Sequence, residues 1–251
     1  MGELRSSNIF STLPDNITEI ILKCLPLRDA ARTSILSREW RYRWITIPVI
    51  VFDRWLPLEL QESQKFKTIF YQVLLLHKGP ILKFTLSVRG LRSCPDINHW
   101  ILFLSKNNVQ EFTLCIYEGD PHILPSHLFT FRQLRHLNLS NCVFKPLPTF
   151  EGFSRLVSLL FSGVIIVPER FVWLISNSPE LEQFWWDGCT EFDCLEIDAP
   201  RLKTFSFFWH FQIHLFQEHP SSCGNLDESN FHGCECGSPW GRKKLLIVSS
   251  F

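Results

Sequence analysis

Apolar residues between positions 81 and 207 recur in one fixed spacing: an apolar residue, two free positions, a second apolar residue, one free position and a third. The copies begin at Ile81, Val109, Leu134, Leu156, Leu181 and Leu202. Consecutive copies start 21 to 28 residues apart. The second and third apolar residues of each triplet alternate as in a strand with one buried face, so we expect one strand in each copy.

Between the triplets lie segments with the spacing of helices. Ser63 precedes the first, Asp96 the second and Pro168 the third, and Gly79-Pro80 is placed to end the first. Their apolar faces consist of Phe66, Ile69, Phe70, Val73 and Leu74; Ile97, Trp100, Ile101 and Leu104; and Phe171, Val172 and Ile175. Strands and helices alternating at this period predict an α/β solenoid of leucine-rich-repeat type, with strands inside and helices outside. The alternative is a generic α/β domain with chance alternation.

Two copies of the repeat are informative in detail. Residues 134–142 match L-x-x-L-x-L-x-x-C outright, and the copy at Leu181 matches with aromatic replacements up to Cys189. Phe192-Leu195-Ile197 adds a further copy only 11 residues after the one before it. This extra copy leaves the number of turns near there open.

The first 50 residues have a purely helical pattern. Pro14 suits the first turn of a helix, and Pro26 ends that segment. Its apolar face consists of Ile17, Ile20, Ile21, Cys24 and Leu25. A second helix is expected from about Arg28 to Leu36, with Ile35 among its packing residues. Ser37 is placed to cap a third helix that carries Trp40 and Trp44. Three such short helices are too small to enclose a core of their own, which suits a segment that completes its apolar surface on a partner. The alternative, which the spacing alone favours, is an ordinary helical subdomain.

Composition excludes several classes of protein. Lys and Arg total 25, as do Asp and Glu, so no overall field favours nucleic acid or an acidic membrane. No apolar run reaches the roughly 18 residues of a membrane span, and no secretory signal is visible. Nine cysteines without such a signal indicate reduced thiols, and hence a nuclear or cytoplasmic protein. Cys24, Cys115, Cys142 and Cys194 lie in apolar patterns, so we expect them to be buried.

Residues that alternate with the triplets are expected to face outward and to offer a binding surface. Trp185 is the most informative of them, because its neighbour Trp186 takes the core position and an exposed tryptophan is a frequent binding anchor. The alternative is that Trp185 lies buried beneath the next turn or beneath the extra copy at 192–197. The outward candidates are His136, Asn138, Gln183, Trp185, Lys203 and Ser206.

The N-terminal segment resembles the F-box, in the form found in plant F-box/LRR/FBD proteins. The resemblance rests on Leu13-Pro14, Ile17, Ile20-Ile21-Leu22, Leu25-Pro26, Arg28-Asp29-Ala30, Arg32-Thr33, Leu36-Ser37-Arg38, Trp40-Arg41 and Trp44. These residues stand at the family's offsets over about 32 positions, and only Asn16 and Glu39 depart from the residue types common there. In the repeats, stretches such as LRHLNLSNCVF and LISNSPELEQF are similar to the same family.

The resemblance implies a non-catalytic, substrate-recruiting subunit of a Skp–cullin–F-box (SCF) ubiquitin ligase. A three-helix F-box (residues 9–48) would bind the Skp-type adaptor and, through it, a cullin–RING ligase. A helical linker (49–80) would lead to degenerate repeats (81–216) that bind an unknown target protein. The implied adaptor-binding residues are Leu13, Pro14, Ile17, Ile20, Ile21, Leu25, Pro26, Asp29, Leu36, Ser37 and Trp40. The alternative is a repeat scaffold, or a truncated F-box protein, that takes no part in ubiquitination.

Residues 217–251 show no repeat, and we expect an irregular or disordered tail in which the family's FBD region is not recognisable. Cys223, His232, Cys234 and Cys236 are zinc-binding residue types, but their spacing is not that of a common zinc finger, so we expect no metal and no cofactor. Nucleophile-elbow, phosphate-loop and H-E-x-x-H motifs are absent from the sequence, so we expect no catalytic residue.

Overall fold

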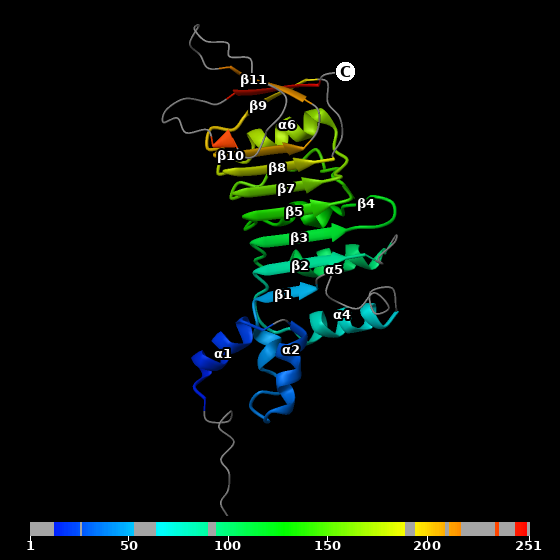
Figure 1. Cartoon of the computed structure of the whole chain (residues 1–251). Helices are drawn as coiled ribbons and strands as arrows, with labels where there is room; N and C mark the ends of the chain where they lie inside the picture. The colour runs from blue at the N-terminus through cyan, green and yellow to red at the C-terminus, as the bar shows by residue number, and fades with distance from the viewer. Residues whose placement is uncertain are drawn as a thin grey trace, which may run out of the picture.

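In the computed structural model the chain forms a stack of strands with helices along one side and a small helical unit at its N-terminal end (Figure 1). The structure describes residues 13–25, 27–52, 64–89, 94–188, 194–208, 211–216, 234–235 and 244–249. The predicted α/β fold with a parallel sheet is observed.

The main sheet has eight strands in the order β1-β2-β3-β5-β7-β8-β10-β12. Neighbouring strands are parallel, except that β12 pairs antiparallel with β10. Each strand up to β10 thus lies beside the strand of the next turn, as in a solenoid. The bounds are Val49–Phe52 for β1, Lys83–Val88 for β2, Glu111–Ile116 for β3, His136–Ser140 for β5, Ser158–Ser162 for β7, Gln183–Asp187 for β8, Thr204–Phe208 for β10 and Cys234–Glu235 for β12.

The six predicted triplets stack in register. Their second residues pair from strand to strand, from Phe84 with Phe112 at one end to Phe184 with Phe205 at the other. Every triplet residue up to Leu202 is buried. Burial of one such side chain contributes about 1.5–3 kcal/mol, so each turn of this column adds to the stability of the stack.

A second repeat, in the backbone, connects each turn to the next. The carbonyl of Pro48 accepts hydrogen bonds from the N–H groups of Leu82 and Lys83, at 2.9 and 3.0 Å. The same double acceptance recurs at the carbonyls of Leu82, Gln110, Arg135, Val157 and Glu182. Because the series begins at Pro48, β1 is the first turn of the stack.

Residues 49–80, expected to be a helical linker, contain a strand as well as helix α4 (Gln64–Leu76). That strand, β1, pairs in parallel with β2, which corrects the expectation. Ile47, Ile50 and Phe52 have the spacing of the other triplets, and all three are buried. The sequence therefore carried the signal for this first turn.

Helices α4, α5 (Asp96–Leu104) and α6 (Pro168–Ser176) lie on one side of the sheet (Figure 1), at the places that the sequence predicts. They pack through aromatic side chains: the ring of Phe70 in α4 stacks on that of Trp100 in α5, with centroids 3.8 Å apart. Both side chains are buried, so the two helices are held together as well as against the sheet.

Asp96, at the start of α5, joins α4 to α5 through its carboxylate. Lys67 Nζ lies 2.9 Å from Oδ2, and the Tyr71 hydroxyl donates to Oδ1 at 2.8 Å. The hydrogen bond from Lys67 lowers the pKa of the Asp96 carboxyl below its ordinary value, against a smaller opposing effect of burial. The folded state thus favours the ionised form, and the stability gained is present above about pH 4 and is lost as pH falls through the lowered pKa.

We expect Asp96→Asn to lower the free energy of unfolding by about 1 kcal/mol at pH 7, because the amide loses the ion pair with Lys67. The difference from wild type should shrink as pH falls below about 4, where the wild-type carboxyl also loses its charge. Urea denaturation at several pH values measures both quantities. Glu19→Gln, which removes an exposed pair with Lys23, is the control and should change stability by less than about 0.5 kcal/mol. Equal stability of Asp96→Asn and wild type at pH 7 would contradict the prediction.

The extra copy at Phe192-Leu195-Ile197 does not enter the main sheet. Its strand β9 (Cys194–Asp198) pairs antiparallel with β13 (Lys244–Ser249), which also pairs with β11 (Phe211–Phe216). β8 pairs directly with β10, so the extra copy adds no turn to the stack. Of residues 217–251, expected to be an irregular tail, the described ones form strands β12 and β13, which corrects the expectation for these residues; the rest of the segment lies outside the described residues.

The cysteines divide between buried and exposed positions. Cys115 and Cys142 are buried as expected, and burial raises the pKa of these thiols to about 11 and about 12, so both are protonated at neutral pH. Cys24 is exposed, which corrects the expectation that it is buried. Six cysteine and histidine residues named in the sequence analysis have side chains outside the described part of the structure: Cys189, Cys194, Cys223, His232, Cys234 and Cys236.

Within the described ranges, no three His, Cys, Asp or Glu side chains are grouped so as to hold a metal ion. The described helices are also too short or too polar to cross a lipid bilayer.

Candidate functional site

The N-terminal unit, residues 13–49, folds around a small apolar cluster at the first turn of the sheet. Its buried members are Leu22, Ala30, Trp40 and Ile47. Four short helices surround most of this cluster: α1 (Asp15–Lys23), α2 (Leu27–Arg32) and the 3₁₀ helices η2 (Thr33–Ile35) and η3 (Arg43–Thr46). Trp44 packs against both this cluster and the main core, so the unit is joined to the repeats by side-chain packing.

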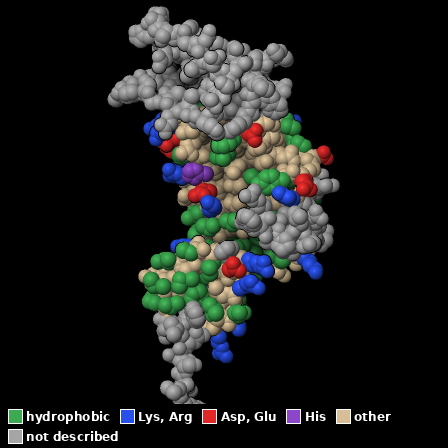
Figure 2. Space-filling view, in the orientation of Figure 1, with side chains coloured by type: hydrophobic (Ala, Val, Ile, Leu, Met, Phe, Trp, Pro, Cys, Tyr) green, Lys and Arg blue, Asp and Glu red, His purple; other side chains and the backbone are tan. Residues whose placement is uncertain are grey.

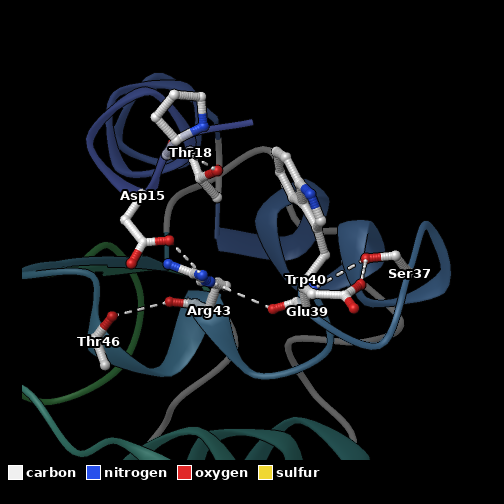
Figure 3. Close-up of polar contacts among 8 residues, drawn as sticks. Asp15, Thr18, Ser37, Glu39, Trp40, Arg43 and Thr46 are labelled. Atoms are coloured by element: carbon white, nitrogen blue, oxygen red, sulfur yellow. Dashed lines mark hydrogen bonds and ion pairs between the residues drawn. The ribbon is translucent and has the colours of Figure 1, made fainter. Parts of the chain in front are cut away.

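The expected third helix is replaced by consecutive turns followed by η3. Ser37 accepts a hydrogen bond from the Trp40 N–H at 3.4 Å and donates to Glu39 Oε2 at 2.6 Å, so it caps a turn rather than a helix (Figure 3). The Arg43 side chain donates to the Glu39 carbonyl at 3.3 Å, while the Arg43 N–H binds the carbonyl of Trp40. Arg43 thereby takes the acceptor that its own N–H would use in an α-helix.

Arg43 also fixes this turn to α1. Its guanidinium lies 2.6 Å from Asp15 Oδ1 at the start of α1 (Figure 3). On the same helix, Thr18 is buried and its hydroxyl donates to the Pro14 carbonyl at 3.2 Å. That hydrogen bond lets a polar side chain face the small core.

Because α1 turns Thr18 and Leu22 inward, its other apolar edge faces solvent. Ile17 is 39% exposed and Ile20 is 57% exposed, and Cys24 continues the same edge. Hydrophobic side chains gather on the surface of the N-terminal unit in Figure 2. We call Ile17, Ile20 and Cys24 the α1 stripe. An apolar stripe held open on a packed helix is a surface that a partner protein can cover.

The structure divides the other predicted adaptor-binding residues into three groups. Pro14 and Asp29 are exposed, whereas Leu13, Ile21, Leu25, Leu36 and Ser37 are partly buried. Trp40 is only 2% exposed, so it serves the internal cluster and has no surface to offer a partner, which corrects its assignment as an anchor. Pro26 lies outside the described residues.

Two exposed apolar residues of the N-terminal unit escaped sequence reasoning. Ile35 is 88% exposed and Tyr42 is 63% exposed. Ile35 was expected to pack within a second helix, but α2 ends at Arg32 and gives way to η2, so the side chain points to solvent. The hydrophobic spacing of the sequence does not predict that either side chain is exposed. For Ile35, the change from α-helix to 3₁₀ helix decides where the side chain points.

The joint between the N-terminal unit and the repeats is close-packed. The N–H of Lys78, just after α4, donates to the carbonyl of Ile45 at 2.9 Å. A Cβ atom on the next residue, Gly79, would lie 2.8 Å from the carbonyl oxygen of Thr46. Only glycine allows this approach of the two backbones, which contrasts with the simple helix-ending role expected for it.

A second candidate surface is the outward face of the sheet, formed by residues that alternate with the triplets. Gln183, Trp185 and Ser206 lie together there, and Trp185 is 43% exposed. They line a shallow pocket of about 270 Å³. Its lining residues are Ser158, Leu159, Leu160, Gln183, Phe184, Trp185, Thr204 and Ser206. The structure therefore gives Trp185 an open position and excludes its burial beneath the next turn.

The remaining outward candidates lie apart from this pocket. His136 is exposed and Asn138 is partly buried, both on β5, two strands before Trp185. Lys203 precedes β10 and forms an ion pair with Glu182 of the previous turn, with Nζ 2.9 Å from Oε2. It belongs to the entrance edge of the sheet rather than to the pocket.

Comparisons with known proteins follow the same division of the chain. The model of the F-box domain matches residues 10–49. The model described as the At1g61320/AtMIF1 LRR domain matches residues 73–237, well over half of the chain. No solved structure matches the chain.

Similar proteins come from Arabidopsis thaliana. The F-box/FBD/LRR-repeat protein At1g13570 is 41% identical over 208 residues, which cover 80% of this chain and 49% of that protein. The F-box/FBD/LRR-repeat protein At5g56420 is 29% identical and the F-box/LRR-repeat protein At4g14103 is 27% identical, over 78% and 81% of this chain. The chain spans about half the length of these relatives.

Proposed function

The chain belongs to the F-box proteins that carry leucine-rich repeats, and from this membership we propose that it recruits substrates to an SCF ubiquitin ligase. In this proposal the F-box binds a Skp-type adaptor, and the adaptor connects the chain to a cullin–RING ligase. The repeats hold a target protein, and the chain itself does no chemistry. We propose the F-box at residues 9–48 as the adaptor-binding part and the degenerate repeats at 81–216 as the target-binding part.

The observation that carries the adaptor proposal is the α1 stripe. Ile17 and Ile20 are exposed on a helix whose opposite edge is packed, and they lie inside the segment that matches the F-box. An amphipathic helix offered in this way is the form that fits an apolar groove on a partner. Pro14 and Asp29 are exposed as well, so adaptor-binding residues expected from the sequence are available at the surface.

The proposal is tested with the full chain and a purified Skp-type adaptor. We expect the two to co-elute in size-exclusion chromatography and to bind with a Kd of about 1 µM or below, as a handful of buried apolar anchors would give. Isothermal titration calorimetry measures the affinity. A folded chain that does not bind the adaptor would contradict the proposal and leave the repeat scaffold as the function.

The same proposal places the chain in the nucleus, the cytoplasm or both. It rests on the reduced state of the cysteines and on the ligase partner rather than on any targeting motif. Fluorescent tagging of the chain in plant cells, followed by fractionation, decides between these compartments.

A further inference from the structure

Charge along the entrance edge of the main sheet, where its parallel strands begin, is compensated at both ends. At one end Lys83 of β2 pairs with Glu111 of β3, with Nζ 2.7 Å from Oε2. At the other end Lys203, before β10, pairs with Glu182, before β8, at 2.9 Å. Strands β5 and β7 lie between these two pairs in the sheet. Charged side chains on the turns of β5 and β7 therefore set the electrostatic character of this edge.

The turns that carry β5 and β7 are basic. Between Asp120 and Glu169 the chain has four Lys or Arg residues and one acidic residue, whereas the whole chain is neutral. Three of the four basic residues precede these strands, and we call them the arginine patch: Arg132, Arg135 and Arg155. Each is exposed, and His136, also exposed, begins β5 beside them. Figure 2 shows Lys or Arg side chains next to a histidine at this edge of the repeats.

Backbone pairing brings the arginine patch together. The carbonyl of Arg135 accepts hydrogen bonds from two N–H groups of the next turn, at 2.8 and 3.0 Å, so the two turns are adjacent at this edge. Arg132 lies in the same turn as Arg135, three residues earlier. Arg155 Nη1 donates to Gln133 Oε1 at 2.7 Å and so connects the two turns through side chains. The patch is therefore one surface that spans two turns.

The guanidinium groups of the patch keep donors available for a ligand. In the part of the chain that the structure describes, none of the three arginines forms an ion pair. The hydrogen bond from Arg155 to the neutral Gln133 amide uses one of several N–H donors and holds the guanidinium in place. A cation positioned in advance in this way loses less conformational entropy when a ligand binds.

These features select an acidic ligand over other classes. A basic ligand would be repelled by the patch, and an apolar ligand would cover charged groups without compensation. Carboxylates bind guanidinium groups through charge-assisted hydrogen bonds, which are often paired. A nucleic acid gains its affinity from many phosphates in a row. Here the carboxylates of Glu111 and Glu182 bound the patch on both sides, so a short acidic segment of a protein fits it better.

We propose that Arg132, Arg135 and Arg155 bind an acidic segment of the recruited protein, through the carboxylates of its Asp and Glu residues. His136 lies beside the patch and offers a further hydrogen-bond donor. This inference rests on the proposed function and deepens it, because it names the kind of target segment that the repeats recognise.

The test measures binding of labelled peptides to the full chain by fluorescence polarisation at low ionic strength. The main probe is a capped octapeptide in which glutamate alternates with glycine. The same peptide with glutamine or lysine in place of glutamate is the comparison. We expect the glutamate probe to bind at least about tenfold more tightly than either. Added salt should weaken this binding, because the contacts are exposed.

Substitutions in the chain assign the binding to the patch. Arg135→Gln combined with Arg155→Gln should weaken binding of the glutamate probe by about tenfold, since each removes charge-assisted contacts. The charge-reversed pair, Arg135→Glu with Arg155→Glu, should instead prefer the lysine probe, a gain of binding that an unfolded chain would not show.

A matched control removes the same charge elsewhere in these turns. It combines Lys145→Gln, after β6 (Cys142–Val143), with Arg170→Gln in α6, and both positions lie outside the segments that lead into β5 and β7. We expect this control to bind the glutamate probe within about twofold of wild type, because salt screens charges beyond about 10 Å.

Equal affinity for the glutamate and glutamine probes would overturn the inference, as would equal losses in the glutamine variant and its control. Tighter binding of a peptide with one phosphoserine, or of a single-stranded oligonucleotide, would assign the patch to phosphate and overturn it as well. Adaptor affinity is measured on the same preparations. Adaptor binding without acidic selection refutes the inference alone, whereas acidic selection without adaptor binding refutes the proposed function.

Discussion

Replacing both Ile17 and Ile20 by Asp is expected to weaken adaptor binding at least about 100-fold while leaving the fold intact. Both side chains are exposed in the free chain, so their loss removes little internal packing. In the complex each substitution would place an unpaired carboxylate against an apolar groove. A 100-fold loss corresponds to about 2.7 kcal/mol, which two central anchors readily account for. Calorimetric titration with the adaptor measures the effect.

A matched variant separates adaptor binding from general surface damage. Ile123 and Ile165 are exposed apolar residues in the repeats, and their replacement by Asp removes a similar apolar area away from the N-terminal unit. We expect that variant to bind the adaptor within about twofold of wild type. Unchanged adaptor affinity for the doubly substituted α1, with a normal melting curve, would rule out the α1 stripe as the docking surface.

Trp40→Ala is expected to destabilise the N-terminal unit by about 3–5 kcal/mol, because it empties the centre of a small buried cluster. The repeats have a separate and larger core, so the loss should be local. Hydrogen exchange followed by mass spectrometry should show lost protection in residues 13–49 and retained protection in β3 to β8. Adaptor affinity should fall with the folded fraction of the unit.

Trp40→Phe distinguishes an internal tryptophan from a surface anchor. Phenylalanine retains most of the buried apolar area, so this variant should keep most of the stability and bind the adaptor nearly as wild type does. If Trp40→Ala instead lowered adaptor affinity without any change in hydrogen exchange or melting, Trp40 would contact the adaptor directly, and the internal assignment would be wrong.

The repeat portion of the fold could be predicted because the same spacing of apolar residues recurs in every turn. From Ile81 to Leu202 each triplet places its side chains in one core, and neighbouring turns impose the same spacing on one another. The first turn was missed although Ile47, Ile50 and Phe52 have that spacing, since 34 residues separate Ile47 from Ile81. The pairing of β9 with β13 was beyond sequence reasoning, because no local pattern specifies contacts between strands some 50 residues apart.

For the candidate site, the sequence predicted which residues take part better than it predicted which way their side chains point. Apolar residues cover so much of α1 that helical spacing cannot tell which edge is buried. The structure resolves this through Thr18, whose hydrogen bond to Pro14 allows it to face inward, so that Ile17 and Ile20 remain outside. Trp185 was correctly placed on the outward face by alternation.

The backbone hydrogen-bond series that begins at Pro48 fixes the distance from one turn of the repeats to the next. β8 lies five strands beyond β1 in the sheet, and neighbouring strands are about 4.8 Å apart, so Trp185 stands about 24 Å from the first turn. In the proposed complex the adaptor binds the N-terminal end of the chain, and the target binds the repeats at a fixed distance from it. Inserting or deleting one turn would change the distance between the target-binding position and the adaptor-binding end by about 5 Å. It would thereby change which lysines of the target come within reach of the transferred ubiquitin.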